Sequence, residues 1–287
     1  MAYEPIIHDI FEPSTGTWQY IVADLPTKAA VIIDPVLDLD PATSAISTQT
    51  ADGLLEVIWE MGYKVVGTLE THVHADHLTA AKYLRSQLRE AQAGAAPDIC
   101  IGGRINVIQE RLSENAYDRL FGDDEVFEIG KLKATALRLP GHTPDHMGYL
   151  IGSNVFAGDS LFNHDVGSAR CDFPGGNARD LFASTRRLLS LPEDTKIWTG
   201  HDYPPAGRGP FAATNVAQQK TQNKHLTQSA TEDEFVKWRE ERDSGLGEPR
   251  LMRRALQFNI RTGNMPALNN NGGRLLHVSV RIPGATW

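Results

Sequence analysis

The segment Thr71-His72-Val73-His74-Ala75-Asp76-His77 lies between a predicted strand and a predicted helix. The apolar run 64–69 before it predicts the strand, and residues 75 to about 89 predict the helix. In α/β proteins, side chains that bind or react are often placed where a strand ends, because a rigid scaffold then holds the loop that carries them. The segment therefore indicates an α/β protein with a functional site at this strand end.

The composition of the segment points to metal chemistry. His72 and His74 are two residues apart in extended chain, so their side chains can leave the same face. Asp76 and His77, at the start of the predicted helix, can turn back toward the same point. Neutral imidazole and carboxylate are ligands that proteins offer to divalent metals. A helix cap among exposed histidines is the plain alternative, and three histidines so close together argue against it.

Three further predicted strands each end in a glycine beside another residue of the metal-binding type. The pairs are Gly141-His142, Gly158-Asp159 and Gly200-His201. One such pair alone usually marks only a turn or a surface histidine, but their joint occurrence favours ligands that converge on one site. His146 and His164 fall outside this pattern and are predicted not to be ligands. Asp145 is expected to orient His142 or His146.

The rest of the chain alternates short strands with helices. Strands are predicted at 18–23, 29–34, 99–101, 132–139, 147–151, 154–157 and 196–199, and helices at 51–62, 105–114 and 178–190. Several strands are joined by turns too short for a crossover helix, which predicts mixed sheets covered by helices rather than a doubly wound parallel sheet. Residues 211–259 read as polar helical segments, and the tail at 275–280 as an edge strand.

Composition narrows the function classes. The chain has 287 residues and a net charge of -8, so a non-specific nucleic-acid binder or a binder of anionic membranes is not expected. No apolar run approaches the roughly 18 residues of a membrane span, and the N-terminus lacks the features of a secretory signal. Cys100 and Cys171 are the only cysteines, which fits a reducing compartment. A cytoplasmic protein is predicted.

The motifs T-H-x-H-x-D-H, G-H-T-P-D-H, A-G-D and G-H, in this order, resemble those of the metallo-β-lactamase superfamily. The resemblance covers about residues 8–205 and implies an αββα sandwich of two mixed sheets flanked by helices, with the site at one edge. It divides the chain into a domain at 1–205 and a C-terminal extension at 206–287, with helices and an edge strand packed on that domain.

Two further stretches are similar to the persulfide dioxygenases, in particular to the bacterial β-lactamase-hydrolase-like branch. One runs from Asp159-Ser160-Leu161-Phe162 to Ala169-Arg170-Cys171-Asp172-Phe173-Pro174-Gly175-Gly176. The other is Pro249-Arg250 with Ala255-Leu256-Gln257-Phe258-Asn259-Ile260-Arg261. They extend the resemblance over nearly the whole chain.

The residues alone are compatible with two metal ions. One ion would take His72, His74 and His142, and the other Asp76, His77 and His201, with Asp159 between them. A hydroxide bridging two zinc ions would hydrolyse an ester or thioester. That is the chemistry of glyoxalase II, the hydroxyacylglutathione hydrolase of the superfamily.

The resemblance to the persulfide dioxygenases implies instead one Fe(II) per chain, held by His72, His142 and Asp159. Two imidazoles and a carboxylate form the facial triad of non-haem iron oxygenases, which leaves positions open for substrate and O₂. The remaining candidates would orient ligands or manage protons: His74, Asp76, His77 and His201. Spacing does not decide between the metals, but the two dioxygenase-like stretches favour iron.

The implied reaction converts glutathione persulfide, O₂ and water into glutathione and sulfite, in sulfide detoxification. Glutathione carries two carboxylates, and Arg170 is predicted to bind one of them, because a guanidinium can grip a carboxylate with two hydrogen bonds. Cys171 is predicted to be an apolar filler rather than a reactive thiol. Family habit suggests a homodimer. A metal-free binding module is disfavoured, because the full ligand inventory is present.

Overall fold

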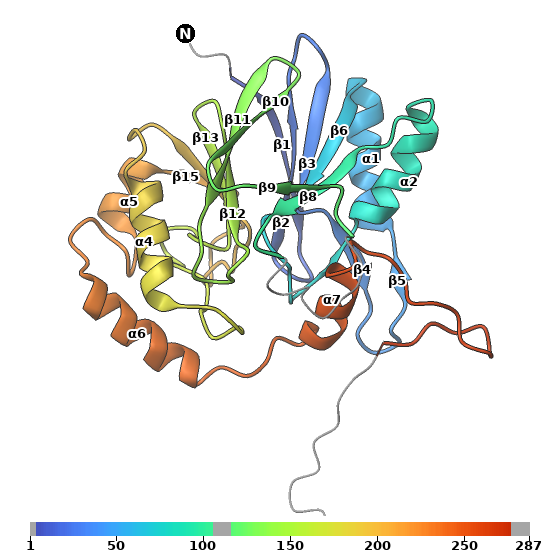
Figure 1. Cartoon of the computed structure of the whole chain (residues 1–287). Coiled ribbons are helices and arrows are strands. Elements are labelled where there is room, and N and C mark those ends of the chain that lie inside the picture. The colour runs from blue at the N-terminus through green and yellow to red at the C-terminus, as the bar shows by residue number, and fades with distance from the viewer. Residues whose placement is uncertain (1–3, 106–115, 277–287) are drawn as a thin grey trace, which may run out of the picture.

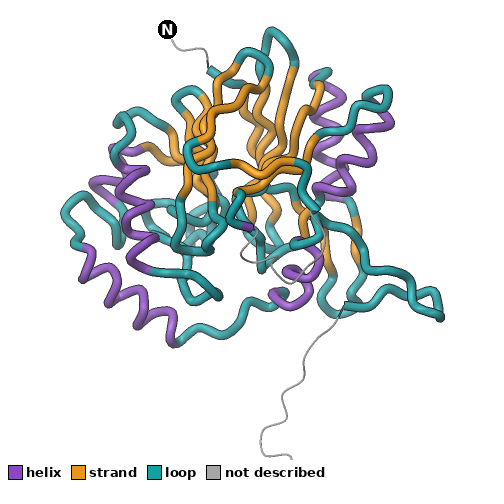
Figure 2. Tube along the Cα trace, viewed as in Figure 1, coloured by secondary structure: helices purple, strands orange, loops and turns teal. Residues whose placement is uncertain are grey.

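The computed structural model describes residues 4–105 and 116–276, and its centre is a sandwich of two six-stranded sheets (Figures 1 and 2). The first sheet has the order β1 (Ile6–Glu12), β2 (Thr17–Ala23), β3 (Ala29–Ile33), β6 (Lys64–Leu69), β8 (Asp98–Gly102), β9 (Arg119–Phe121). The second has the order β10 (Glu125–Ile129), β11 (Leu132–Arg138), β12 (Met147–Ile151), β13 (Asn154–Gly158), β14 (Lys196–Thr199), β15 (Ala213–Asn215).

Both sheets are mixed, as the short turns predict. Hairpins join β1 to β2 and β10 to β11 in antiparallel pairs, whereas β3 with β6 and β13 with β14 are parallel pairs with long connections. A small third sheet has the order β5 (Ile46–Ser47), β4 (Val36–Leu39), β7 (Leu78–Thr79). It lies next to the segment that carries the histidines.

The main core fills the space between the two large sheets. Tyr20 and Ile33 from the first sheet meet Phe127, Tyr149 and Phe156 from the second, all nearly inaccessible to solvent. Strands β2 and β3 are buried along their whole length, because helices cover the face that does not meet the other sheet. Their continuous apolar sequences follow from burial on both faces.

Helices cover the outer faces of the sandwich (Figure 1). On the first sheet lie α1 (Gln49–Met61) and α2 (Ala81–Ala91), which bury apolar side chains against it. On the second lie α4 (Ala178–Leu189), α5 (Val216–Gln222) and α6 (Glu232–Ser244). The αββα sandwich is therefore confirmed.

The C-terminal segment contributes side chains to the hydrophobic clusters on both large sheets. Helix α6 contributes Phe235 to the cluster on the second sheet, whereas α7 (Met252–Asn259) contributes Ala255 and Phe258 to the cluster on the first. In Figure 1 the orange and red segment accordingly runs along one edge of both sheets. The domain boundary at 205 stays a prediction.

The helix predicted from residue 75 is wrong in its start, since α2 begins at Ala81. The preceding segment is irregular because side chains from elsewhere bind its backbone. Asp145 Oδ2 accepts a hydrogen bond from Val73 N–H, and Asn259 Oδ1 accepts one from Thr79 N–H. Most of the helix predicted at 105–114 and most of the strand at 275–280 lie outside the described residues.

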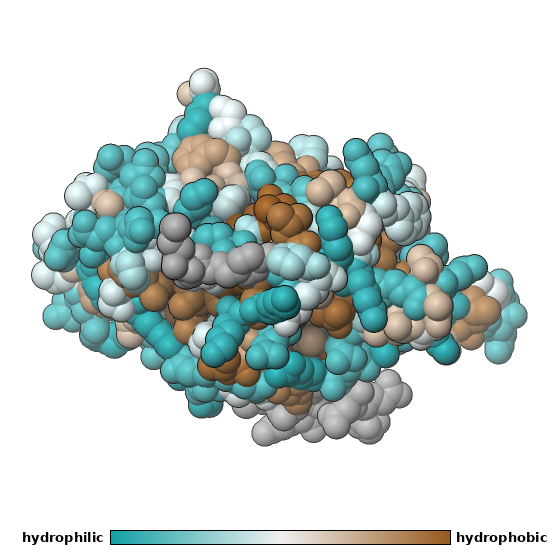
Figure 3. Space-filling view, turned by 90° about the horizontal axis from the view of Figure 1, so that it is seen from above, coloured by the Kyte–Doolittle hydropathy of each residue, from teal (hydrophilic) through white to brown (hydrophobic). Residues whose placement is uncertain are grey.

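Within residues 4–105 and 116–276 no helix is both long enough and apolar enough to cross a bilayer. The face seen in Figure 3 is mostly hydrophilic, with hydrophobic side chains scattered over it.

Candidate metal centre

His72, His142 and Asp159 meet at one edge of the sandwich. His72 follows β6, His142 follows β11 and Asp159 follows β13, so three strand ends deliver one side chain each. One ligand atom from each lies within 4.8 Å of the others, and all three residues are buried. His142 Nε2 is 3.6 Å from Asp159 Oδ2. This is the set that the dioxygenase resemblance implies.

Hydrogen bonds orient the two imidazoles. His142 Nδ1 lies 2.7 Å from the backbone carbonyl of Arg170, which can only accept, so Nδ1 carries the proton and Nε2 is left for a metal. His72 Nδ1 lies 3.0 Å from Thr71 Oγ1, and that hydroxyl donates to Asp34 Oδ2. Burial lowers the pKa of His72 well below its usual value, which keeps the ring neutral and able to bind a cation.

His146 supports the site without being one of these three. Its Nε2 accepts a hydrogen bond from the backbone N–H of Asp159 at 2.9 Å. Burial lowers the pKa of His146 to about 3, so its ring stays neutral and can keep accepting. His146 Nε2 is thus already used in a hydrogen bond, and the expectation that His146 is no ligand stays a prediction.

A second group of candidate ligands lies beside the first. Atoms of His74, Asp76 and His77 lie within 4.8 Å of one another. His201 Nε2 lies between two carboxylates, 3.0 Å from Asp76 Oδ2 and 3.6 Å from Asp159 Oδ1. All seven residues that the sequence proposed for metal chemistry are therefore brought to one place.

His74 also faces a carboxylate pair that the sequence analysis missed. Its Nε2 is 3.0 Å from Asp34 Oδ1 and 3.4 Å from Glu70 Oε2, with all three residues buried. Burial disfavours the charged imidazole, but the Asp34 charge and hydrogen bond outweigh it and raise the pKa of His74 well above its usual value. Asp34 directly follows β3 and precedes Pro35, and that position next to a strand end was the available signal.

The donor set fits a divalent metal. Among the buried side-chain atoms without a hydrogen-bond partner in the described ranges, five belong to the candidate ligands: Asp76 Oδ2, Asp159 Oδ1, His74 Nδ1, and His77 Nδ1 and Nε2. Polar atoms this deep are normally paired, so the unpaired nitrogens of His77 beside carboxylate oxygens call for a cation. His74, whose pKa is raised, must lose a proton before its ring can bind one. Two imidazoles with one carboxylate suit iron as well as zinc.

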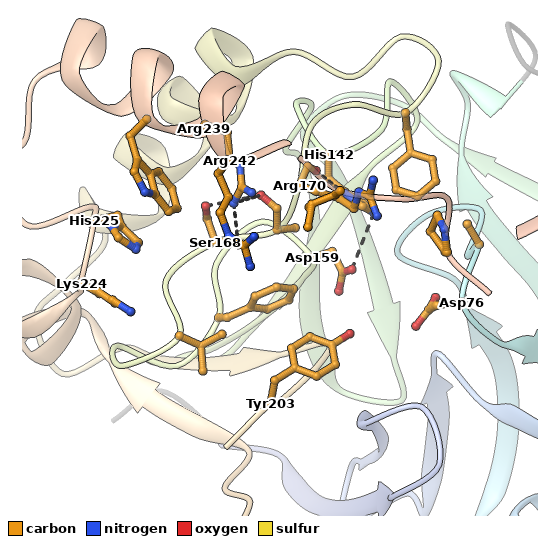
Figure 4. Close-up of a pocket in the computed structure, with 18 residues that line it drawn as sticks. Asp76, His142, Asp159, Ser168, Arg170, Tyr203, Lys224, His225, Arg239 and Arg242 are labelled. Carbon is orange, nitrogen blue, oxygen red and sulfur yellow. Dashed lines mark hydrogen bonds and ion pairs between the residues drawn. The ribbon is translucent and has the colours of Figure 1, made fainter. Parts of the chain in front are cut away.

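A cavity of about 490 Å³ leads to these residues (Figure 4). Asp76, His142 and Asp159 line it, and Figure 4 shows Lys224 and His225 far from Asp76 on the other side. Four cationic side chains line it: Arg170, Lys224, Arg239 and Arg242. The cavity that reaches the candidate metal ligands therefore has a positively charged lining, which would attract a small anion.

Comparison with known families agrees with this geometry. The family described as "Metallo-beta-lactamase superfamily" matches residues 15–201. The chain belongs to the metallo-β-lactamase superfamily. The matched range contains every candidate metal ligand, from His72 to His201.

Among relatives in this superfamily, a "Beta-lactamase hydrolase-like protein" of Xylella fastidiosa is 41% identical, over 99% of this chain and 67% of that protein. "Glyoxylase B2" of Dictyostelium discoideum is 39% identical, over 91% of this chain and 92% of that protein. "Persulfide dioxygenase ETHE1, mitochondrial" of Homo sapiens is 31% identical, over 81% and 79% respectively. The crystal structure of ETHE1 from Myxococcus xanthus superposes with a TM-score of 0.73 at 29% identity, covering 90% of this chain and all of that one.

Arg170 lies in the cavity wall, but its guanidinium is already paired. Nε and NH2 donate to the two carboxylate oxygens of Asp172 at 2.6 and 2.5 Å, and NH1 donates to the Gly247 carbonyl at 2.9 Å. A substrate carboxylate would compete with Asp172 for this fork. Arg170 could be singled out from the sequence, but its pairing with Asp172, two residues on, could not.

Two neighbouring expectations have clear outcomes. Burial raises the pKa of the Cys171 thiol to about 12, so the nearby arginines do not activate it and the interpretation as a filler holds. Asp145 was expected to orient His142 or His146, which is wrong. Its Oδ2 accepts from the backbone of Val73 instead, so it supports the histidine segment from outside.

Gly200 offers a test of the Asp159 position. A Cβ on Gly200 would lie 2.6 Å from Asp159 Oδ1 and 3.0 Å from the Gly158 carbonyl carbon. The carboxylate can move more easily than the backbone, so we expect Gly200→Ala to push Asp159 out of the ligand group. Retained metal, measured by mass spectrometry after dialysis against a chelator, should fall about tenfold. Gly209→Ala, where nothing lies within 4 Å of the added carbon, is the control, and equal metal contents would contradict the assignment.

Proposed function

We propose that the chain is a mononuclear Fe(II) persulfide dioxygenase that oxidises glutathione persulfide with O₂ and water to glutathione and sulfite. The observation that carries the proposal is the buried group of His72, His142 and Asp159, of which His142 and Asp159 line a cavity that four cationic side chains also line. The relative named persulfide dioxygenase supports the reaction class.

When bound, ferrous iron supplies the one-electron chemistry that O₂ needs and leaves coordination positions for substrate. The chain's own residues prepare the site for it. The Arg170 carbonyl fixes the tautomer of His142, and Thr71 with Asp34 fixes that of His72. Burial of the ligands keeps water away from them, which strengthens charge interactions with a bound anion.

The substrate class follows from the charge of the cavity. Glutathione persulfide carries two carboxylates, and a protein with a net charge of -8 needs local cations to attract it. Arg239 is buried and paired with Asp243, whereas Lys224 and Arg242 are exposed and have no ion-pair partner within the described ranges. We propose Arg170, Lys224 and Arg242 as the substrate-binding cations.

Substitution of Lys224 or Arg242 should have only a modest effect on catalysis. A rim charge is worth about 0.5–1 kcal/mol, so Arg242→Ala should lower kcat/KM for glutathione persulfide about two- to fivefold, and less at high salt. Lys237 is exposed on the same helix α6 and does not line the cavity. Lys237→Ala is therefore the matched control, and an equal loss in both variants would remove Arg242 from the substrate site.

A binuclear zinc hydrolase of the glyoxalase II type is the second candidate. The grouping of His74, Asp76 and His77 favours it, because these residues could hold a second ion. The name of the Dictyostelium relative points the same way. In this case a thioester of glutathione would be the substrate.

Metal analysis and oxygen uptake separate the two candidates. Protein produced with both iron and zinc available should contain about one iron per chain and should consume O₂ when given glutathione persulfide. About two zinc ions per chain, with thioester hydrolysis and no oxygen uptake, would establish the hydrolase instead. A cytoplasmic location and a homodimer are proposed alongside, the first because both cysteines are free and buried.

A further inference from the structure

Asn259, the last residue of α7, is buried against the segment that carries the histidines. Its Nδ2 donates to the backbone carbonyls of His74 and His77, at 2.8 Å each. Its Oδ1 accepts from the backbone N–H of Thr79 at 2.9 Å. We propose that Asn259 is a positioning residue, which holds this segment in the conformation that binds metal.

The segment needs such a partner because no helix or sheet pairs its backbone groups. Residues 70–77 belong to neither a helix nor a strand, although nearly all of them are buried. Buried carbonyls without a hydrogen bond are costly, and a side-chain amide offers two donors and an acceptor on one rigid group. Asn259 uses both donors and its oxygen on three backbone groups that span Thr79, His77 and His74.

Helix α7 is well anchored, so the amide is held in place. Leu251, Ala255 and Phe258 pack in the same core cluster as Leu54 and Leu84 from α1 and α2. The backbone carbonyl of Asn259 accepts a further hydrogen bond from the Tyr117 hydroxyl at 3.0 Å. Any movement of the amide would therefore require movement of the core.

Asn259 completes a set of three supports around the histidines. Asp34 binds Thr71 and His74, and Asp145 binds the Val73 backbone, so two aspartates hold the first half of the segment. Asn259 holds the second half. Groups that orient metal ligands typically change metal affinity 10- to 100-fold when removed, roughly. The inference applies to either metal and does not depend on the reaction proposed above.

The test compares variants that remove the side-chain hydrogen bonds of Asn259 with a variant that removes only a hydrogen bond to its backbone. Asn259→Ala removes the three side-chain hydrogen bonds, and Asn259→Ser is the milder variant if the first does not fold. Tyr117→Phe is the control, because it removes only the hydrogen bond to the Asn259 backbone. Affinity for Zn(II), and for Fe(II) without oxygen, is measured on metal-free protein by chelator competition at a temperature where all variants are folded. Hydrogen exchange of residues 72–80 is measured in parallel.

We expect the Asn259 variants to bind both metals about tenfold more weakly or worse. Exchange of residues 72–80 should be faster in them than in Tyr117→Phe, even where the two lower the melting temperature equally. Because metal stabilises the folded state in proportion to its affinity, the rise in melting temperature on adding Zn(II) should also shrink. Unchanged metal affinity in Asn259→Ala or Asn259→Ser, with only a lower melting temperature, would overturn the proposal.

Discussion

His72→Ala, His142→Ala and Asp159→Ala should each empty the metal site and reduce oxygen uptake with glutathione persulfide to background. Each substitution removes one of the three proposed iron ligands, and two protein ligands alone should not hold iron against a chelator. His74→Ala and His201→Ala should keep most of the iron, because in the mononuclear arrangement these rings lie outside the ligand set. Iron per chain after dialysis is the measurement.

The control for this series is His164→Ala. His164 lies outside the group of candidate ligands, so its loss should leave iron content unchanged. If His74→Ala empties the site as thoroughly as His72→Ala, the mononuclear assignment is wrong and the second group also binds metal. Zinc per chain, measured in the same variants, would then give the number of zinc ions that the hydrolase binds.

The second large effect concerns Arg170. Arg170→Ala should lower kcat/KM for glutathione persulfide about ten- to a hundredfold at unchanged iron content, because a charge-assisted hydrogen bond to a carboxylate is worth roughly 1.5–3 kcal/mol. Arg170→Lys should recover only part of this, since an ammonium lacks the planar fork. A small persulfide without carboxylates should be turned over equally by wild type and Arg170→Ala.

Asp172 makes this prediction sharper. If Arg170 binds substrate, Asp172→Ala frees the guanidinium, and KM should stay the same or fall. If the pair only supports the loop, Asp172→Ala should damage the enzyme as much as Arg170→Ala does, on both substrates. Arg179 is also paired with carboxylates but lies outside the cavity, so Arg179→Ala is the control and should change neither parameter.

The fold and the meeting of the candidate ligands could be predicted because they depend on local signals. Each ligand follows a strand that its own sequence marks, and strand ends in a sandwich converge on one edge. His142 and Asp159 could be predicted as ligands in this way, although each motif alone is weak. The αββα arrangement was implied by the resemblance of the ordered motifs to the superfamily, and the turns too short for crossovers predicted only that the sheets are mixed.

The parts that could not be predicted depend on contacts between distant residues. Local sequence favours a helix from residue 75, but Asp145 and Asn259 bind the backbone there and α2 starts later. Asp34 carries no mark of its role except its place at a strand end. The ion pair of Arg170 involves Asp172, only two residues away. The sequence does not show that both carboxylate oxygens of Asp172 face the guanidinium, whereas the structure does.

The hydrogen bonds of Asn259 have a consequence for how the protein is made. They join residues 182 and 185 positions apart, so they cannot form until α7 has been synthesised. Chains fold from the N-terminus as they emerge from the ribosome, and contacts this distant form last. With Asn259 in the proposed role, the histidine segment of a nascent chain is fixed, and its full affinity for metal is reached, only after α7 has docked.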